Sequence, residues 1–371
     1  MQWLAIDFGT SNSAVALPYA GGVYRIPLEH GNDTLPTAVF FPANGGPMRI
    51  GTAAAEALIA GDEGRYMRAL KSVLGLPLLH ETRLIGGRRR SIADVITAFL
   101  AELRARAEAA TGLSLRHALS GRPVHFHTSD PEKDARAEAD LRACYLAAGF
   151  EEVAFLPEPE AAALASPGAG QGLGLVVDIG GGTSDFTLFR KAEGLPEILT
   201  SHGIRLGGTD FDHAISMRHA MPLLGLGAEL RREMGPGRVP VPRAPFVDLA
   251  TWAKIPFLYT PETRRLAAEM ARMAVEPARL RRFAEVLEHE LGHTIAFAVE
   301  RGKIAANRAA SPGRIALDAV EPGLAAEVTG ESLDDALTTA RLGLSRAAAE
   351  TLELAGVAPE AVDEIVLVGG S

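Results

Sequence analysis

Alternating hydrophobic and polar positions predict a β-hairpin at the N-terminus. Residues 4–8 and 14–17 each have the pattern of a strand, and the GTSNS segment between them favours a turn. The same arrangement returns about 170 residues later, where strands at 173–178 and 186–189 flank a segment with three consecutive glycines. Because this distance is far longer than the repeat of a solenoid, it predicts two related lobes.

Other segments have the patterns of helices and of isolated strands. Hydrophobic residues recur at helical spacing after Ser91, the expected N-cap, with Asp94 as its capping partner and Gly112 as the end of the helix. We also predict strands at 124–126 and 364–368, and helices at 131–149, at 161–165, at 285–307 and from Ser332 onward.

Two segments rich in glycine and proline interrupt this regular pattern. The SPGAGQG segment at residues 166–172 is the best linker candidate, so we expect a lobe boundary there. The prolines at 235–245 predict an irregular loop inside a helical region. The expected organisation is a lobe I at 1–171 with an inserted subdomain at about 31–115, and a lobe II at 172–371 with an inserted helical subdomain at about 213–306.

The composition is that of a globular protein and narrows the possible partners. Of 371 residues, 47% are hydrophobic and 22% are charged, close to the average for folded domains. The net charge of −9 argues against nucleic acid and anionic membranes as partners. The single cysteine, Cys144, points to a reducing compartment, and the N-terminus lacks a signal peptide, so we expect a cytoplasmic protein.

The two glycine-containing hairpins favour phosphate chemistry. A tight turn of glycine and hydroxyl residues aims backbone N–H groups and hydroxyls at one point, which suits phosphate oxygens. Asp7 and Asp178 end the strands beside these turns, where carboxylates can hold the waters of Mg²⁺. Two such hairpins would clamp a polyphosphate and its metal, as phosphoryl transfer requires. The chain has no P-loop motif, which excludes that class of enzyme.

At this point the sequence resembles the ATPase domain of the 70 kDa heat-shock chaperones, the DnaK-like branch of the actin and hexokinase superfamily. The resemblance implies an α/β, two-lobed, actin-like ATPase fold with ribonuclease-H-like sheets and inserted subdomains. It also implies that the last helices of this fold are absent from the chain. The motifs that carry it are DFGTSNS at 7–13, LPEPEAAA at 156–163, DIGGGTSD at 178–185, GGTDFD at 207–212 and IVLVGGS at 365–371.

The resemblance also implies roles for individual residues. Asp7 and Asp178 would hold Mg²⁺ through water, and one of only five lysines, Lys71, falls where the family has its catalytic lysine. Without the resemblance, an ordinary solvated lysine would be the better interpretation of Lys71. The catalytic residues would be Lys71, Glu158, Asp185 and Thr183.

The nucleotide would be ATP or ADP, bound between the lobes. The hairpin residues would contact the phosphates, and a helix with the glycine motifs of lobe II would hold the nucleoside. The implied nucleotide-binding residues are Gly9, Thr10, Ser11, Asn12, Gly180, Gly181, Gly182, Gly207, Gly208, Glu300, Lys303, Asn307, Gly369, Gly370 and Ser371.

The resulting hypothesis is a monomeric chaperone-type ATPase that hydrolyses ATP slowly to close its lobes. Its expected partners are unfolded proteins and a co-chaperone or nucleotide-exchange factor. A small-molecule kinase of the same superfamily, acting on a sugar or an acid, is the first alternative. A zinc metalloprotease is the second, because HELGH at residues 289–293 matches the pattern His-Glu-x-x-His on a predicted helix.

Overall fold

The protein forms two compact units, each with its own hydrophobic core. One unit consists of Met1–Arg205 and Arg346–Ser371, and the other of Leu206–Ser345. This division differs from the one expected near residue 171, and the lobes 1–171 and 172–371 remain a prediction; most of the expected linker, 166–171, lies outside the described residues. The computed structural model describes residues 2–29, 31–127, 130–165, 172–191, 196–232, 235–308 and 312–370.

The first unit contains a six-stranded sheet in which the neighbours follow the order β11-β10-β1-β2-β3, while β4 pairs with β2. β1, β10 and β11 run parallel, whereas β2 is antiparallel to β1. The β1–β2 pair confirms the predicted N-terminal hairpin. The bounds are β1 Trp3–Phe8, β2 Asn12–Tyr19, β3 Gly22–Arg25, β4 Thr34–Pro36, β10 His117–Arg122 and β11 Glu152–Pro157.

A second sheet of the same unit has the strand order β14-β13-β12-β19. β12 and β13 form the second antiparallel hairpin, and β19, although far away in sequence, lies parallel to β12. The predicted second hairpin and the predicted C-terminal strand are therefore confirmed. The bounds are β12 Leu173–Ile179, β13 Ser184–Arg190, β14 Glu197–Ile204 and β19 Glu364–Val368.

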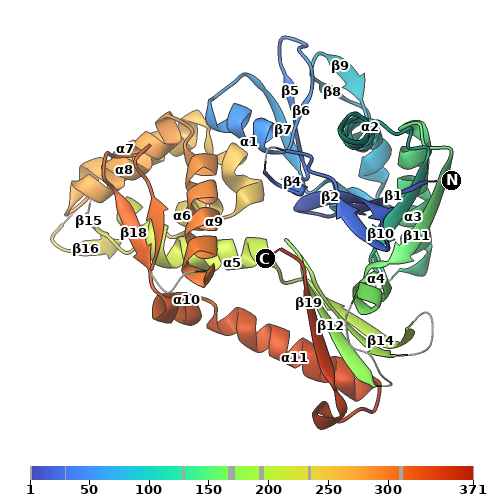
Figure 1. Cartoon of the computed structure of the whole chain (residues 1–371). Coiled ribbons are helices and arrows are strands. Elements are labelled where there is room, and N and C mark those ends of the chain that lie inside the picture. Colours follow the sequence, from blue (N-terminus) through green and yellow to red (C-terminus); the bar gives the residue numbers. More distant parts are fainter. Residues whose placement is uncertain are drawn as a thin grey trace. The chain divides into compact units, whose positions relative to one another are not determined.

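Three helices support the two sheets. α2 (Ile92–Thr111) begins with the predicted capping box of Ser91 and Asp94 and ends at Gly112, which has a φ of 70°. α3 (Pro131–Ala147) packs beside α2 against the first sheet, as Figure 1 shows, and α4 (Glu158–Ala165) contacts strands of both sheets. Cys144 on α3 is buried in the core, as predicted, and burial raises the pKa of its thiol to about 11.

Smaller elements complete the first unit. A three-stranded sheet, covered by α1, and the β8–β9 hairpin lie between the first hairpin and α2 in the sequence. α11 (Thr338–Leu354) continues from the second unit into the first. The bounds are α1 Thr52–Ile59, β5 Ala38–Pro42, β6 Arg49–Ile50, β7 Gly64–Arg68, β8 Arg83–Ile85 and β9 Arg88–Arg90, with 3₁₀ turns η1 Leu70–Val73, η2 Pro77–His80 and η6 Pro359–Ala361.

The second unit is mainly helical, in agreement with the helical texture of its sequence. α7 and α8 pack side by side and bury Met270 and Phe283 between apolar faces (Figure 1). Two short hairpins, β15–β16 and β17–β18, accompany the helices. The bounds are α5 Gly208–Ile215, η3 Ser216–Ala220, η4 Met221–Leu224, β15 Glu229–Arg231, β16 Arg238–Pro240, α6 Ala244–Leu249, η5 Trp252–Leu258, α7 Pro261–Met273, α8 Pro277–Glu288, α9 Gly292–Arg308, β17 Gly313–Ala316, β18 Ala325–Val328 and α10 Gly330–Ala336.

The strand predicted at 124–126 is wrong, because the strand lies earlier, at His117–Arg122. Pro123 has no N–H to donate to a sheet. The next amides bond elsewhere, since the N–H groups of Phe126 and His127 both donate to Asp134 Oδ1 on α3. The segment is thus held by a helix rather than by a strand.

Three further boundaries differ from the predictions. The single helix predicted at 285–307 is two helices, α8 and α9, separated by Glu290 with a φ of 55°. The N-cap of α10 is Thr329, whose hydroxyl accepts from the Ser332 N–H, so Ser332 is not the cap. Within the proline-rich segment 235–245, predicted as an irregular loop, β16 pairs with β15 in a two-stranded hairpin, where prolines remain tolerable at an edge.

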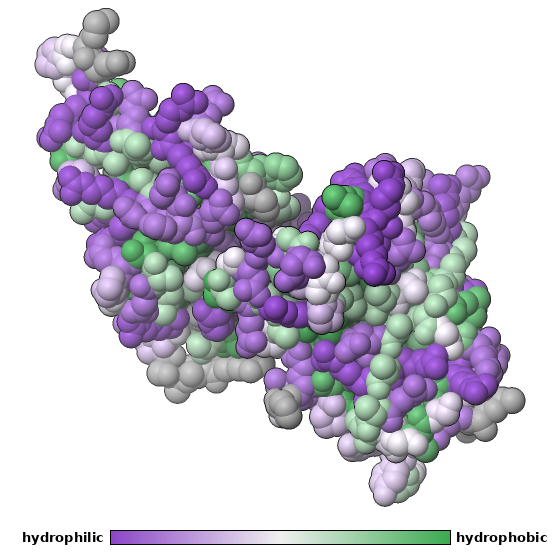
Figure 2. Space-filling model, turned by 90° about the horizontal axis from the view of Figure 1, so that it is seen from above, coloured by the Kyte–Doolittle hydropathy of each residue, from purple (hydrophilic) through white to green (hydrophobic). Residues whose placement is uncertain are grey.

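The described surface is predominantly polar. On the face shown in Figure 2, hydrophilic residues predominate, and hydrophobic residues form small patches among them. Among the residues that the structure describes, no helix combines the length and apolar character needed to cross a membrane.

Candidate phosphate and metal site

The carboxyl ends of the parallel strands in the first sheet bring two predicted residues to one edge. Asp7 lies near the end of β1, and Glu158 follows β11 as the first residue of α4. Between these strands, Gly121 of β10 is a neighbour of Glu158, because an added Cβ would lie 3.4 Å from Glu158 Cγ, in ordinary van der Waals contact. Ligands of open α/β sheets bind at such an edge, so its position agrees with the predicted function.

The second sheet contributes a pair of aspartates at the corresponding edge. Asp178 of β12 stands directly opposite Asp185 of β13 in the antiparallel register. Gly203 of β14 leaves room for this pair, because a Cβ there would lie 2.5 Å from Asp185 Oδ1. On the other side, Gly369 has a φ of 94°, and its Cβ would lie 2.7 Å from Asp178 Oδ1. Both aspartates are thus surrounded by closely approaching backbone.

Lys71 lies in the first unit as a buried, paired residue and not as a solvated lysine. Its ammonium nitrogen lies 2.7 Å from Glu158 Oε1, across 87 positions of sequence, and its side chain is only 10% exposed. A buried charge requires a partner of this kind. The ordinary interpretation of Lys71 as a solvated residue is therefore wrong.

The ionisation of these groups is coupled. Burial raises the pKa of Asp178 to about 7, and the charges of Glu158 and Asp185 add to this effect. Burial and Glu158 likewise raise the pKa of Asp185 to about 6, and they raise the pKa of Asp7. The three aspartates, from both sheets, therefore each lie near Glu158, whose charge makes their ionisation less favourable.

For Lys71 the same surroundings favour the charged form instead of the neutral one. Burial lowers the pKa of its ammonium, but the charge and hydrogen bond of Glu158, together with Asp7 and Asp178, outweigh burial and raise it. Lys71 therefore stays protonated, and its one positive charge balances only part of the negative charge of the four carboxylates. A cation would neutralise the remainder.

The tips of the two hairpins lie against each other. A Cβ on Gly181 would come within 2.1 Å of Ser11 Oγ, so a larger residue here would require the Ser11 side chain to rotate. The first tip is tight, because a Cβ on Gly9 would lie 2.2 Å from the Asn12 carbonyl oxygen. The Gly180 N–H donates to the Thr183 carbonyl at 2.9 Å and closes the second tip. The two turns are therefore close together where Gly181 approaches Ser11.

Two further contacts hold the first tip. The Thr37 N–H donates to the Ser11 carbonyl at 2.8 Å, and the buried hydroxyls of Ser13 and Thr37 are 2.7 Å apart. Thr10 and Ser11 are half-buried and Asn12 is exposed, as is Thr183 on the second tip. The backbone of the tip is thus anchored while polar groups remain accessible to a ligand.

The residues fit a magnesium ion that keeps its water. The donor atoms are carboxylate oxygens, which hard cations prefer, and their raised pKa values mark uncompensated negative charge. No group of three His, Cys, Asp or Glu close enough to ligate a metal directly occurs in the described part of the chain. That Asp7 and Asp178 hold the ion through its waters remains a prediction from the resemblance.

The other predicted nucleotide residues belong mostly to the second unit. Gly207 and Gly208 begin α5, and Glu300 and Asn307 lie on α9. Lys303 of α9 is 8% exposed, and its ammonium lies 2.8 Å from Asp212 Oδ1 of α5. Their nucleoside-binding roles remain predictions from the resemblance.

The structure describes all but the last residue of the glycine motif at the end of the chain. Gly370, in the first unit, would place a Cβ 3.5 Å from Asn12 Nδ2 and so lies at the first hairpin. Gly182, on the second tip, has open space around it. Ser371 lies outside the described residues.

The HELGH segment does not form the helical turn that a zinc protease needs. α8 ends at Glu288, and Glu290 has a left-handed backbone. His289 therefore lies just beyond the end of α8, whereas His293 lies on α9. His289 Nε2 is 3.2 Å from Glu285 Oε2, and the His293 ring meets Trp252 edge-on at 4.6 Å. The geometry that the zinc alternative assumed is therefore absent from this segment.

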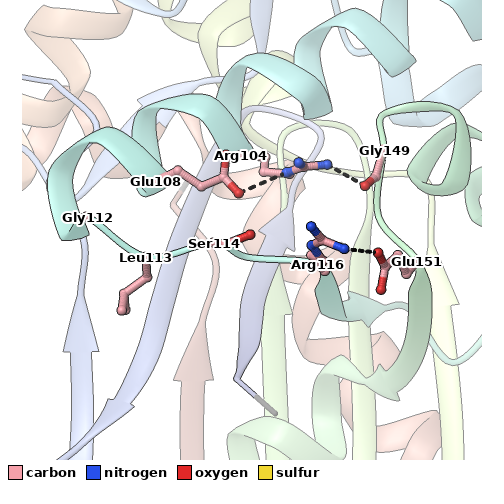
Figure 3. A pocket seen from close by; sticks show the side chains of 8 residues that line it. All are labelled: Arg104, Glu108, Gly112, Leu113, Ser114, Arg116, Gly149 and Glu151. Atoms are coloured by element: carbon pink, nitrogen blue, oxygen red, sulfur yellow. Dashed lines mark hydrogen bonds and ion pairs between the residues drawn. The ribbon is translucent and has the colours of Figure 1, made fainter.

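A pocket of about 490 Å³ lies at the opposite edge of the first sheet (Figure 3). It is lined by residues that precede β10 and β11, including Arg116 and Glu151, whose side chains pair at 2.5 Å. Arg104 pairs with Glu108 at 3.3 Å and also donates to the Gly149 carbonyl. Because both guanidinium groups already have anionic or carbonyl partners, the pocket is a poor candidate for phosphate.

A glycine at the site is not among the residues that the sequence predicts. Gly203 makes room for Asp185, although it is a lone glycine within a strand. A glycine within a strand often marks a close approach of another group, and this was the available signal. What approaches it cannot be read from local sequence.

Paired glycine turns, strand-end aspartates and a buried lysine define the class of nucleotide-binding α/β proteins with an actin-like ATPase fold. A family model described as Hsp70 protein matches residues 3–222, more than half of the chain. The chain belongs to the Hsp70 family.

Curated relatives agree with this assignment. The chain is 33% identical over 247 residues to "Chaperone protein HscA homolog" of Burkholderia multivorans, an alignment that covers 61% of this chain and 38% of that protein. It is 34% identical over 259 residues to the protein of the same name from Pseudomonas paraeruginosa, covering 63% and 39%. The aligned segments thus span about two fifths of the length of these relatives.

Proposed function

We propose that this chain is a Mg²⁺-dependent ATPase of the chaperone type, with its phosphate site at the carboxyl ends of the strands in the first unit. The observation that carries the proposal is the Lys71–Glu158 pair set among Asp7, Asp178 and Asp185. Structural ion pairs do not need three further carboxylates, each made harder to ionise by its surroundings. A site that must accept a metal and a polyphosphate does.

The two hairpin tips form the phosphate cradle in this proposal. We expect their amides and the hydroxyls of Thr10, Ser11 and Thr183 to contact the phosphates near the point where Gly181 approaches Ser11. Successive backbone N–H groups in tight turns bind anions, and the missing Cβ atoms permit a close approach. This part of the site binds and orients the phosphates.

Asp7 and Asp178 hold the metal through its water molecules. When bound, Mg²⁺ neutralises charge on the phosphate oxygens. The two carboxylates come from different sheets, one from each hairpin, so they fix the position of the ion relative to both tips. Their own pKa values, raised without a cation, fall when a cation is present, because the charge favours their ionised forms.

Lys71, Glu158 and Asp185 perform the chemistry. The ammonium of Lys71 stabilises negative charge on the transferred phosphoryl group, and Glu158, held by that ammonium at 2.7 Å, positions the attacking water. Asp185, with a pKa of about 6, is poised to accept a proton near neutral pH. We expect water to be the acceptor.

The chaperone part of the proposal comes from the relatives, which are named as chaperone proteins. We propose that unfolded proteins are the clients, and that a co-chaperone or nucleotide-exchange factor controls the slow hydrolysis of a monomeric ATPase. Stimulation of ATP turnover by an unfolded polypeptide would support this part.

The experiment is ATP turnover by the purified chain with and without Mg²⁺, with a panel of sugars and acetate added. We expect Mg²⁺-dependent release of phosphate that the panel does not change. Transfer of phosphate to a sugar or to acetate would replace the proposal with the kinase alternative. No turnover and no ADP binding in the presence of Mg²⁺ would contradict the ATPase proposal.

A further inference from the structure

The segment that carries Lys71, residues 69–80, has a backbone conformation that its own sequence does not favour. Lys71 lies on the single 3₁₀ turn η1, which is preceded by Ala69 with a φ of 57°. A left-handed alanine is strained, and such strain persists only where surrounding contacts determine the conformation. The contacts that hold this segment therefore also determine where Lys71 lies.

A buried carboxylate on α3 bridges two points of the segment. Asp140 is 9% exposed, and its Oδ2 accepts from the Gly75 N–H at 3.1 Å. Its Oδ1 lies 3.0 Å from His80 Nε2, at the end of η2. One side chain thus ties both ends of residues 75–80 to the helix. Burying a carboxylate costs free energy unless hydrogen bonds compensate it, and here those bonds all go to the Lys71 segment.

His127 provides a second tether, immediately after the last turn of η1. Its Nε2 lies 2.8 Å from the carbonyl oxygen of Leu74, and since a carbonyl only accepts, Nε2 carries the proton. His127 is itself fixed, because its N–H donates to Asp134 of α3 at 3.1 Å. The tether therefore connects Leu74 to the same helix.

Close packing completes the attachment. Gly75 has a φ of 75°, and a Cβ there would lie 2.6 Å from the carbonyl oxygen of Lys133 on α3. Leu70, Leu74 and Leu79 are buried in the core of the first unit. The apolar contacts hold the segment down, while the polar contacts determine its position along α3.

We propose that Asp140 and His127 are positioning residues, which fix the Lys71 segment to α3 and so place the Lys71 ammonium beside Glu158. The catalytic consequence rests on the proposed ATPase function, whereas the positional consequence does not. A displacement of about 1 Å at a reacting group can reduce turnover by roughly a hundredfold, so small changes in this attachment are expected to matter.

The first experiment measures the position of Lys71 without any nucleotide. The chain has five lysines, and amine acylation followed by mass spectrometry reports each of them separately. In the wild-type protein Lys71 should react slowly, since it is buried and paired. Asp140→Asn and His127→Phe should each raise the acylation rate of Lys71 severalfold and leave the other lysines unchanged. His127→Gln, which restores a donor for Leu74, should bring the rate back towards wild type.

A matched control separates positioning from general loss of stability. Asp94→Asn removes another structural carboxylate, which caps α2 by accepting from the N–H and hydroxyl of Ser91. This variant should lower Tm without changing the acylation of Lys71. If Asp140→Asn fails to fold, the His127→Phe and His127→Gln pair still decides the question.

The second experiment measures turnover and binding. Asp140→Asn and His127→Phe should lower kcat by about tenfold or more while the Kd for ADP with Mg²⁺ stays within about twofold, because the phosphate cradle is intact. Equal acylation of Lys71 in the wild type and in the folded variants would overturn the inference. If the wild type hydrolyses no ATP, the proposed function fails, but the acylation result still tests the attachment.

Discussion

The two glycine hairpins of the first unit share a plan and differ in the residue that faces the strand aspartate. Asp7 stands opposite Ala14, whereas Asp178 stands opposite Asp185. Like charges directly across an antiparallel pair repel each other, and this repulsion adds to burial in raising the pKa of Asp178 to about 7. The first hairpin therefore supplies one carboxylate, while the second holds a pair that exchanges protons near neutral pH.

The tips differ as well. Gly9 faces a backbone carbonyl, that of Asn12, whereas Gly181 faces the hydroxyl of Ser11. A backbone atom cannot move aside, but a serine side chain can rotate. The first tip is thus fixed by its own turn, and the second is adjusted by its contact with the first. The pair teaches that two motifs of similar sequence can differ in how rigidly their turns are held and in how readily their aspartates ionise.

The largest effect on turnover should come from substitution of Lys71, whose positive charge acts on the strand aspartates of both hairpins. Lys71→Ala should lower kcat by roughly 10²–10³-fold, since a preorganised charge at the reacting group is lost. ADP affinity should change little. Lys254→Ala, at an exposed lysine of the second unit, is the control. Steady-state turnover of Lys71→Ala equal to that of the control would mean that Lys71 has no catalytic part.

Substitution of Asp7 or Asp178, the aspartates proposed to hold the metal, should have the next largest effect on turnover. Asp7→Asn and Asp178→Asn should each reduce Mg²⁺-dependent turnover by roughly 10–100-fold, as expected for residues that hold a metal through water. Raising the Mg²⁺ concentration should recover part of the loss in both variants. A titration of turnover against Mg²⁺ checks this, and a normal Mg²⁺ dependence in either variant would remove that aspartate from the metal site.

The difference between the two tips should appear in the free energy of unfolding when the glycine of each tip is replaced by alanine. Gly9→Ala should lower the free energy of unfolding by about 2–3 kcal/mol, because its Cβ meets the Asn12 carbonyl. Gly181→Ala should cost about 1 kcal/mol or less, because Ser11 can rotate away. Urea unfolding of the two variants gives the comparison, and equal losses would contradict the distinction between a fixed and an adjustable tip.

The smallest effect concerns pH and the facing aspartates. Since the pKa of Asp178 is raised, its contribution to stability is complete below the unfolded pKa near 4 and is lost as pH rises through about 7. Asp178→Asn should therefore stabilise the metal-free protein at pH 8 by about 1–2 kcal/mol, after allowance for solvent screening, and by nothing at pH 4. This corresponds to a rise in Tm of about 2–8 °C at pH 8.

Asp7→Asn is the comparison for this measurement. Asp7 lacks a facing carboxylate, so its substitution should give a smaller gain at pH 8 than that of Asp178. Thermal unfolding of both variants and the wild type at the two pH values provides the test. A gain for Asp7→Asn as large as for Asp178→Asn would show that the facing pair is not the source of the difference.

The sequence by itself determined the local elements and the motif positions. Both hairpins, the capping box at Ser91 and the end of α2 at Gly112 follow from residues close together in the chain. Asp7 and Asp178 were recognisable because each ends a strand before a glycine turn. Such features depend on backbone geometry within a few residues, and this is the range over which sequence patterns act.

Only the tertiary structure decided which residues meet. The Lys71–Glu158 pair joins residues 87 positions apart, and Asp140 reaches Gly75 across 65. The break at Glu290 likewise overrides a continuous helical pattern, and with it the geometry of HELGH. These outcomes depend on burial and on charges brought together by folding, because the cost of removing an ion from water is set by its whole surroundings and not by its neighbours in sequence.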